Sequence, residues 1–135
     1  MANILAKVTV LYVEANEELR KELITILQSV LKKVYICTDG IEAFYLYEKK
    51  KESIDLVLAN VNIPGINGVD LLKKIRAIDK DLPFMINTIH TQTELLLEAI
   101  EYDVTEYIPK SISTKELLLK IANRCHDRFS YIKVA

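Results

Sequence analysis

The sequence predicts an α/β fold in which an open parallel sheet lies between two layers of helices. Five short apolar segments rich in β-branched residues alternate with longer amphipathic segments along the 135 residues, the pattern of repeated strand and helix units. The chain is too short for the eight units of a closed barrel. Because right-handed crossovers place helices on both faces of an open sheet, we expect a doubly wound (βα)5 three-layer sandwich.

The first two units are defined by their strands and by the signals that start the helices. Residues 8–13 form the first expected strand, and Asn16 then stands where a helix begins, with two glutamates following it. An asparagine at this position accepts from free backbone N–H groups, and acidic residues in the first turn interact favourably with the helix dipole. A second strand is expected at 34–37, and residues 38–40 lead into the second helix.

The third unit contains the most apolar of the strands. Residues 55–59 show almost no polar alternation, as expected for a central parallel strand that is covered on both faces. The pairs Pro64–Gly65 and Asn67–Gly68 mark a turn-rich loop. The helix after this loop is expected to run from about Val69 to Ile78.

The last two units complete the sheet. Strands are expected at 84–87 and 104–108, and helices at 94–101 and from Thr114 or Lys115 to about Ser130. For five such units the flavodoxin-like strand order 2-1-3-4-5 is the natural choice. The glycines form no phosphate-binding cradle, which disfavours a P-loop or dinucleotide-binding fold.

Composition limits the organisation and the classes of partner. We expect one domain over residues 1–135, because the length allows one substantial hydrophobic core. The net charge is −1 and the longest basic run is Lys49–Lys51, which argues against direct nucleic-acid binding. Cys37 and Cys125 have no metal or redox spacing and are expected to be unpaired. No signal peptide or membrane span is expected, so the chain is interpreted as cytoplasmic.

Polar residues follow the strands at the edge where such sheets place their sites. In this fold the site lies beyond the carboxyl ends of the strands, near the point where the strand order reverses. Residues at this edge come from four strand ends, and they are Glu14, Ala15, Asn16, Asn60, Asn62, Thr88, Ile89 and Lys110.

This set resembles the response-regulator receiver domain. That family has an acidic pair after the first strand, a phospho-accepting aspartate after the third, Ser or Thr after the fourth and Lys after the fifth. The loop from Asn62 to Gly68 and the spacing of Tyr107 and Lys110 add to the likeness, which spans about residues 7–128. The resemblance implies a two-component or phosphorelay signalling module rather than an enzyme.

The same resemblance implies that the phosphoryl chemistry is lost. Asn60 stands at the phospho-accepting position and lacks a nucleophilic carboxylate, and Ala15 removes one member of the acidic pair, leaving Glu14. Mg²⁺ prefers carboxylate oxygens, so we expect weak binding or none at the would-be positions Glu14, Asn60 and Asn62. We expect Lys110 to donate to the Asn60 amide oxygen or to pair with Glu14.

Two further departures lie at the rim of this site. Ile89 stands where the family usually has a small residue, and Ser111 replaces the proline that usually follows the lysine. The branched Ile89 side chain is expected to narrow the approach to the pocket.

The resemblance also implies an output surface. In the family, the hydroxyl residue and an aromatic on the fifth strand change position; here these are Thr88 and Tyr107. We therefore expect a protein partner, such as a histidine kinase, an output domain or another signalling protein, on the surface of helix 94–101, the fifth strand and the last helix. Leu95–Leu97 supply apolar area beyond one buried face, Tyr102, Tyr107 and Tyr131 are candidate anchors, and a homodimer is compatible with this surface.

Three functions remain open at this point. The first is a degenerate pseudo-receiver that binds a protein without phosphorylation. The second is a receiver that accepts a phosphoryl group on residue 60 in its native form, with Asn60 as an engineered substitution. The third is a flavodoxin-like cofactor binder or enzyme, which is disfavoured because neither His90 nor His126 has an evident catalytic companion.

Overall fold

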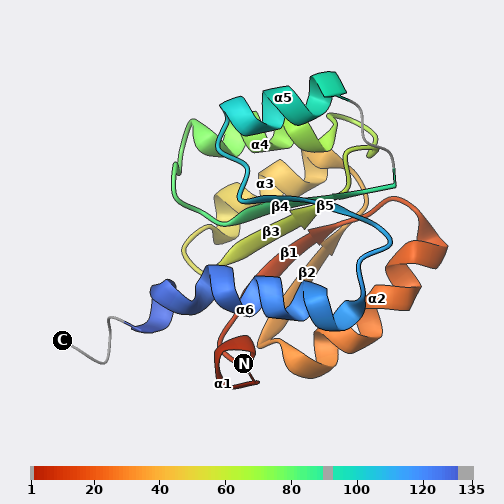
Figure 1. Cartoon of the computed structure of the whole chain (residues 1–135). Helices are drawn as coiled ribbons and strands as arrows, with labels where there is room; N and C mark the ends of the chain where they lie inside the picture. Colours follow the sequence, from red (N-terminus) through yellow and green to blue (C-terminus); the bar gives the residue numbers. More distant parts are fainter. Residues whose placement is uncertain (1, 90–92, 131–135) are drawn as a thin grey trace.

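A five-stranded parallel sheet forms the centre of the molecule (Figure 1). The computed structural model describes residues 2–89 and 93–130, so His90 and Tyr131 lie outside the described residues. The strands are β1 (Thr9–Val13), β2 (Lys33–Cys37), β3 (Leu56–Ala59), β4 (Phe84–Thr88) and β5 (Glu106–Pro109). Their order is β2-β1-β3-β4-β5 and every neighbouring pair is parallel, which confirms the predicted doubly wound sheet.

Helices cover both faces of the sheet. They are α1 (Ala2–Leu5), α2 (Glu17–Val30), α3 (Gly40–Lys50), α4 (Gly68–Arg76), α5 (Thr93–Glu101) and α6 (Thr114–Ser130). Figure 1 shows α2 and α6 on one face and α3, α4 and α5 on the other. The short α1 packs against α6; the sequence did not predict it, because so few residues show no helical period.

Side-chain caps start four of the helices, α2, α3, α4 and α6, and at α6 the Ser113 hydroxyl accepts from Glu116 N at 3.1 Å. The side chain of Asn16 accepts from Leu19 N at 3.0 Å, which confirms its predicted role at the start of α2. Asp39 begins α3 and Asn67 begins α4 in the same way. Each cap satisfies a backbone N–H that the helix itself leaves free, worth about 1 kcal/mol.

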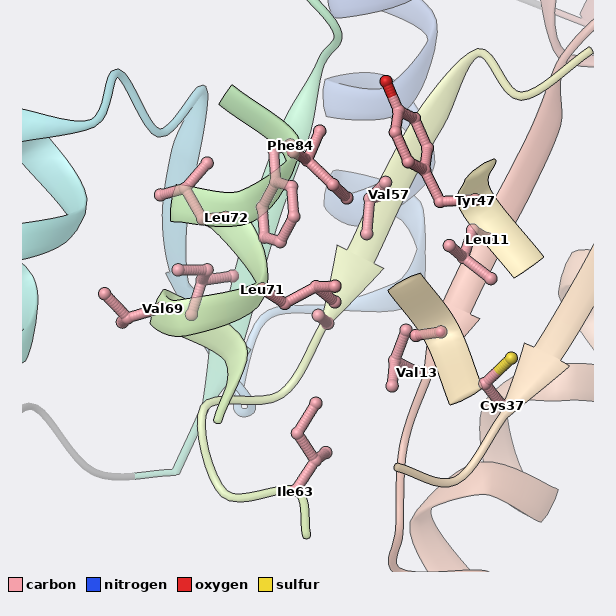
Figure 2. Packing of buried hydrophobic residues seen from close by; sticks show 14 of the residues in the cluster. Leu11, Val13, Cys37, Tyr47, Val57, Ile63, Val69, Leu71, Leu72 and Phe84 are labelled. Atoms are coloured by element: carbon pink, nitrogen blue, oxygen red, sulfur yellow. The ribbon is translucent and has the colours of Figure 1, made fainter. Parts of the chain in front are cut away.

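The alternation of side chains along the central strands divides the core in two. Leu11 and Val13 of β1 face the layer of α3, α4 and α5, whereas Val10 and Tyr12 face α2 and α6. Figure 2 shows the first cluster, in which α4 packs over the middle of the sheet. Its labelled members from β3, β4 and α4 include Val57, Phe84, Val69, Leu71 and Leu72. Burial of each such side chain contributes about 1.5–3 kcal/mol.

The largest differences from the predicted element boundaries lie at the start of the fifth strand and at the end of the helix after the third strand. The fifth strand begins at Glu106 rather than Val104, because Asp103 has a positive φ of 57° and Thr105 pairs with Phe84 partly through its side chain. Helix α4, predicted to reach Ile78, ends at Arg76. The Ile78 side chain is exposed and does not join the core.

The cysteines are structural. Cys37 and Cys125 are buried and free, in the two different core clusters, as predicted. Burial raises the pKa of each thiol to about 12, so neither is a thiolate near neutral pH. Within residues 2–89 and 93–130, no helix has the length and apolar character needed to cross a membrane.

Candidate functional site

The register of β1 and β3 places Glu14 and Asn60 side by side. Val13 pairs with Ala59, and each is the last residue of its strand. The next residues therefore leave the sheet together, and Asn60 N donates to Val13 O at 3.1 Å. This edge is where the strand order reverses, as the sequence predicted.

Lys110 reaches the same edge from the end of β5, which is separated from β1 by β3 and β4. Thr88 pairs with Pro109 at the ends of β4 and β5, and Lys110 N donates to Thr88 O at 2.9 Å. The lysine side chain then extends across to β1. Its ammonium group donates to Glu14 Oε1 in an ion pair, one of the two arrangements expected from the sequence.

The Glu14 carboxylate is enclosed and surrounded by donors. Its side chain is 1% exposed and that of Lys110 is 10% exposed. Asn60 Nδ2 lies 3.2 Å from Glu14 Oε2 and 3.4 Å from Oε1, and Asn16 N donates to Oε2 at 3.1 Å. A buried charge is tolerated only when it is paired and hydrogen-bonded, and here both carboxylate oxygens have donors.

Comparison with known proteins identifies the family. Residues 10–122, most of the chain, match the response regulator receiver domain. The chain belongs to the receiver domain family. It is 32% identical to the non-phosphorylated HemR receiver domain from Leptospira biflexa, with a TM-score of 0.77 over 88% of this chain and 94% of that one.

Two curated relatives are longer proteins. The response regulator SaeR of Staphylococcus aureus is 32% identical over 91 residues, which are 67% of this chain and 39% of SaeR. The two-component response regulator ARR14 of Arabidopsis thaliana is 31% identical over 88 residues, which are 65% of this chain and 23% of ARR14. The receiver chain thus spans well under two thirds of the length of either relative.

Hydrogen bonds at both the nitrogen and the oxygen of the Asn60 side-chain amide fix its orientation. Its Nδ2 faces the Glu14 carboxylate, while its Oδ1 accepts from Asn62 N at 3.2 Å. Asn60 is buried, whereas the Asn62 residue is exposed. In this receiver, residue 60 is therefore a bridge between β1 and the loop after β3.

Glycines allow that loop to lie close to the sheet. Gly65 has a φ of 84°, a conformation that residues with a Cβ rarely adopt. A Cβ at Gly68 would collide with the backbone carbonyl of Asn60. The close approach is fixed by a hydrogen bond of 3.0 Å from Gly68 N to Val61 O.

The remaining expected positions lie around this centre. Ala15 and Ser111 are exposed, and Ile89 is 63% exposed. Thr88 is buried at the end of β4. The Tyr107 hydroxyl is buried with no hydrogen-bond partner among the described residues, and burial raises its pKa; this hydroxyl therefore points inward.

One residue at the site escaped the sequence analysis. Arg20 lies in the first turns of α2, and its Nη1 donates to Glu14 O at 3.0 Å and to Ala15 O at 3.4 Å. The guanidinium thus ties the first turns of α2 to the backbone that follows β1. The only signal in the sequence is a basic residue one turn after the Asn16 cap, which is too common a pattern to predict this contact.

Proposed function

We propose that this chain is a degenerate receiver that acts by binding another protein and does not accept a phosphoryl group. The observation that carries the proposal is the amide at residue 60, whose Nδ2 faces the Glu14 carboxylate. An amide nitrogen is not a nucleophile for phosphoryl transfer, and this one is engaged in a hydrogen bond. The function is then one of recognition and not of catalysis.

The donor set at this edge does not fit Mg²⁺. The ion prefers several oxygen ligands in octahedral geometry, usually with carboxylates among them. Among the described residues Glu14 is the one carboxylate at the expected metal positions, and its oxygens are engaged by Lys110, Asn60 and Asn16. Across residues 2–89 and 93–130, no three His, Cys, Asp or Glu side chains gather as a metal site. Weak or absent Mg²⁺ binding is part of the proposal.

The alternative is a receiver whose native residue 60 is an aspartate. Its support is the buried Thr88 together with Lys110, the two positions that the family uses to bind the phosphoryl group, which remain at the correct edge of the sheet. The two functions predict different results when a carboxylate is introduced at residue 60 and phosphorylation is measured.

Intact-mass spectrometry after treatment with acetyl phosphate and Mg²⁺ separates the two. The wild-type chain is expected to gain no phosphoryl adduct. Asn60→Asp and the double variant Ala15→Asp/Asn60→Asp are treated in parallel, with Asn62→Asp as the control for a carboxylate at the rim. An adduct on the wild type would overturn the proposal, and a stoichiometric adduct on Asn60→Asp alone favours the alternative.

The proposed partner surface is formed by α5, β5 and α6. Leu97 and Ile100 of α5 are 58% and 56% exposed, and the adjacent Tyr102 is also exposed. Glu106 of β5 pairs with Lys120 and Arg124 of α6. An apolar patch with a charged rim is typical of a protein interface, and a signalling protein or a second copy of this chain suits it.

Substitution on α5 tests this surface. Sedimentation over a range of concentrations measures self-association of the wild type, Leu97→Glu and Ile100→Glu. Ile41→Glu is the matched control, because Ile41 is 61% exposed on α3, outside the proposed surface. Loss of association in the α5 variants only assigns the surface to a homodimer; a wild type that stays monomeric excludes the homodimer.

A further inference from the structure

A cavity lies between α2 and α6, beside the site, and it shares Lys110 with that site. Its volume is about 150 Å³, room for several water molecules or one small metabolite. Apolar side chains such as Leu19 and Leu23 line it together with the polar residues Glu22, Asn87 and Lys110. Figure 1 shows the two helices on the same face of the sheet.

Asn87 is an unusual residue for its place in this wall. It belongs to β4, where Met85, two residues earlier on the same face, is fully buried in the apolar cluster under α2 and α6. Asn87 is 5% exposed, and its Oδ1 has no hydrogen-bond partner among the described residues. A buried acceptor without a donor is unfavourable. A ligand in the cavity that donates a hydrogen bond to Asn87 Oδ1 would remove this cost.

The charges in the lining are of opposite sign. They belong to Lys110, whose ammonium group is also paired with Glu14, and to Glu22, which is an exposed residue. Tyr12 also lines the cavity, and burial followed by the Glu14 carboxylate raises the pKa of its hydroxyl, while Arg20 lowers it and Glu22 raises it by smaller amounts. A molecule with one charge satisfies only one side of this lining, whereas a zwitterion satisfies both.

We propose that this cavity binds a small zwitterionic α-amino acid of the size of alanine or serine. Its carboxylate pairs with Lys110, and its ammonium group donates to Asn87 Oδ1 and faces Glu22. The inference goes beyond the proposed protein-binding function and does not depend on it. Because Lys110 also holds Glu14, the ligand shares a residue with the site and couples amino-acid binding to the end of β1.

Titration followed by ¹⁵N–¹H NMR tests this assignment. L-alanine and L-serine are expected to produce saturable shifts in the side-chain amide of Asn87 and in backbone amides of α2 and α6 near the cavity. Propanoate lacks the ammonium group and ethylamine lacks the carboxylate, and each is expected to bind at least about tenfold more weakly. Propanoate or ethylamine binding as tightly as alanine would overturn the proposal, as would the absence of saturable shifts with either amino acid.

Two variants locate the binding. Asn87→Leu removes the unpaired acceptor and leaves an apolar residue of similar size, so the chain is expected to fold and to lose at least about tenfold in affinity for alanine. Glu22→Gln keeps the side-chain shape and removes its charge. It is expected to weaken the binding of alanine without affecting the binding of propanoate. Glu18→Gln, an exposed glutamate of α2 that does not line the cavity, is the control. Unchanged alanine affinity in both Asn87→Leu and Glu22→Gln would place any binding elsewhere and refute the assignment.

Discussion

Lys110 Nζ donates to Glu14 Oε1 although the two residues are 96 positions apart in the chain. The ion pair joins the end of β5 to the end of β1, across β3 and β4. Both side chains are nearly inaccessible, so the pair acts at low effective dielectric and removal of one partner leaves a buried charge.

Lys110→Met is therefore expected to lower the free energy of unfolding by about 3 kcal/mol, because Glu14 keeps only the Asn60 and Asn16 donors. Urea denaturation followed by circular dichroism measures the change. Lys21→Met is the control, since its pair with Glu17 is 73% and 67% exposed and contributes at most about 0.5 kcal/mol.

A double-mutant cycle tests the coupling directly. Glu14→Gln combined with Lys110→Met removes both charges and is expected to be more stable than the sum of the single losses predicts. Additive single and double losses would show that the two side chains do not interact in solution.

Asn60→Asp is expected to destabilise the chain by about 2 kcal/mol at pH 7 without Mg²⁺, because a carboxylate then faces the Glu14 carboxylate in place of the Nδ2 donor. Like-charge repulsion raises the folded-state pKa of the introduced carboxyl group, so the loss is present above that pKa and shrinks as the pH falls below it. Urea denaturation between pH 4 and pH 8 follows this trend. Asn62→Asp, at an exposed position, should show no such pH dependence.

The sequence was sufficient to predict the sheet and the edge at which its polar residues gather. Strand order followed from five apolar segments, and Glu14, Asn60 and Lys110 came together because parallel strands end at one edge. The partner of Lys110 required the structure, since the sequence left both Glu14 and the Asn60 amide oxygen available. That choice depends on side-chain reach across the sheet, which periodicity does not describe.

Other features depended on contacts between segments that are distant in the chain. The start of β5 follows from the positive φ at Asp103 and from the Thr105 side chain bonding to Phe84; β propensity alone extended the strand to Val104. The unpaired Asn87 Oδ1 was equally hidden, because its significance lies in the apolar surroundings and not in its own type. Arg20 is a third such case.

Gly68→Ala tests the close approach of the loop to Asn60. A Cβ at this position meets the backbone carbonyl of Asn60, which belongs to the sheet edge and has little room to move. We expect a loss of about 2 kcal/mol and displacement of the Asn60 side chain from Glu14. Denaturation measures the first effect, and a shift of the Asn60 side-chain amide NMR signal measures the second.

Gly65→Ala is the comparison for that variant. Its cost arises from the positive φ and from a tight contact of the new Cβ with the Ile41 side chain, and it is expected to be about 1 kcal/mol, with the Asn60 signal in place. Equal displacement in both variants would mean that general loosening of the loop, not the contact at Gly68, determines the position of Asn60.

Arg76 holds the end of α4 against two loops. Its guanidinium donates to the backbone oxygens of Tyr102, Asp79, Leu82 and Asp103, and burial lowers its pKa. Arg76→Met leaves the buried Leu82 carbonyl and three partly buried carbonyls without this donor, and it is expected to cost about 3 kcal/mol in thermal or urea denaturation. Arg76→Lys should recover only a minor part, since an ammonium group does not reproduce the planar set of donors; full recovery by lysine would show that charge alone matters.

The ion pairs of Glu106 with Lys120 and Arg124 of α6 make the free energy of unfolding depend on pH. Burial alone would raise its pKa, but hydrogen bonds from Arg124 and Lys120 bring the pKa below the ordinary value. The folded state therefore binds this proton less tightly than the unfolded chain. The stabilisation is present above the unfolded pKa of about 4.3 and is lost as the pH falls through the lower folded pKa. Glu106→Gln is expected to cost up to about 1 kcal/mol at pH 7, because Arg124 and Lys120 are partly exposed.

The same variant should flatten the acid limb of the stability curve. The free energy of unfolding of the wild type and of Glu106→Gln, measured in urea from pH 7 to pH 3, should converge below the folded pKa of Glu106, where the wild-type carboxyl group is protonated. Glu101→Gln on α5, at an exposed residue, should leave the wild-type slope unchanged. A constant difference between wild type and Glu106→Gln across the whole range would show that the loss at pH 7 comes from packing, and that the ion pairs with Lys120 and Arg124 contribute nothing measurable.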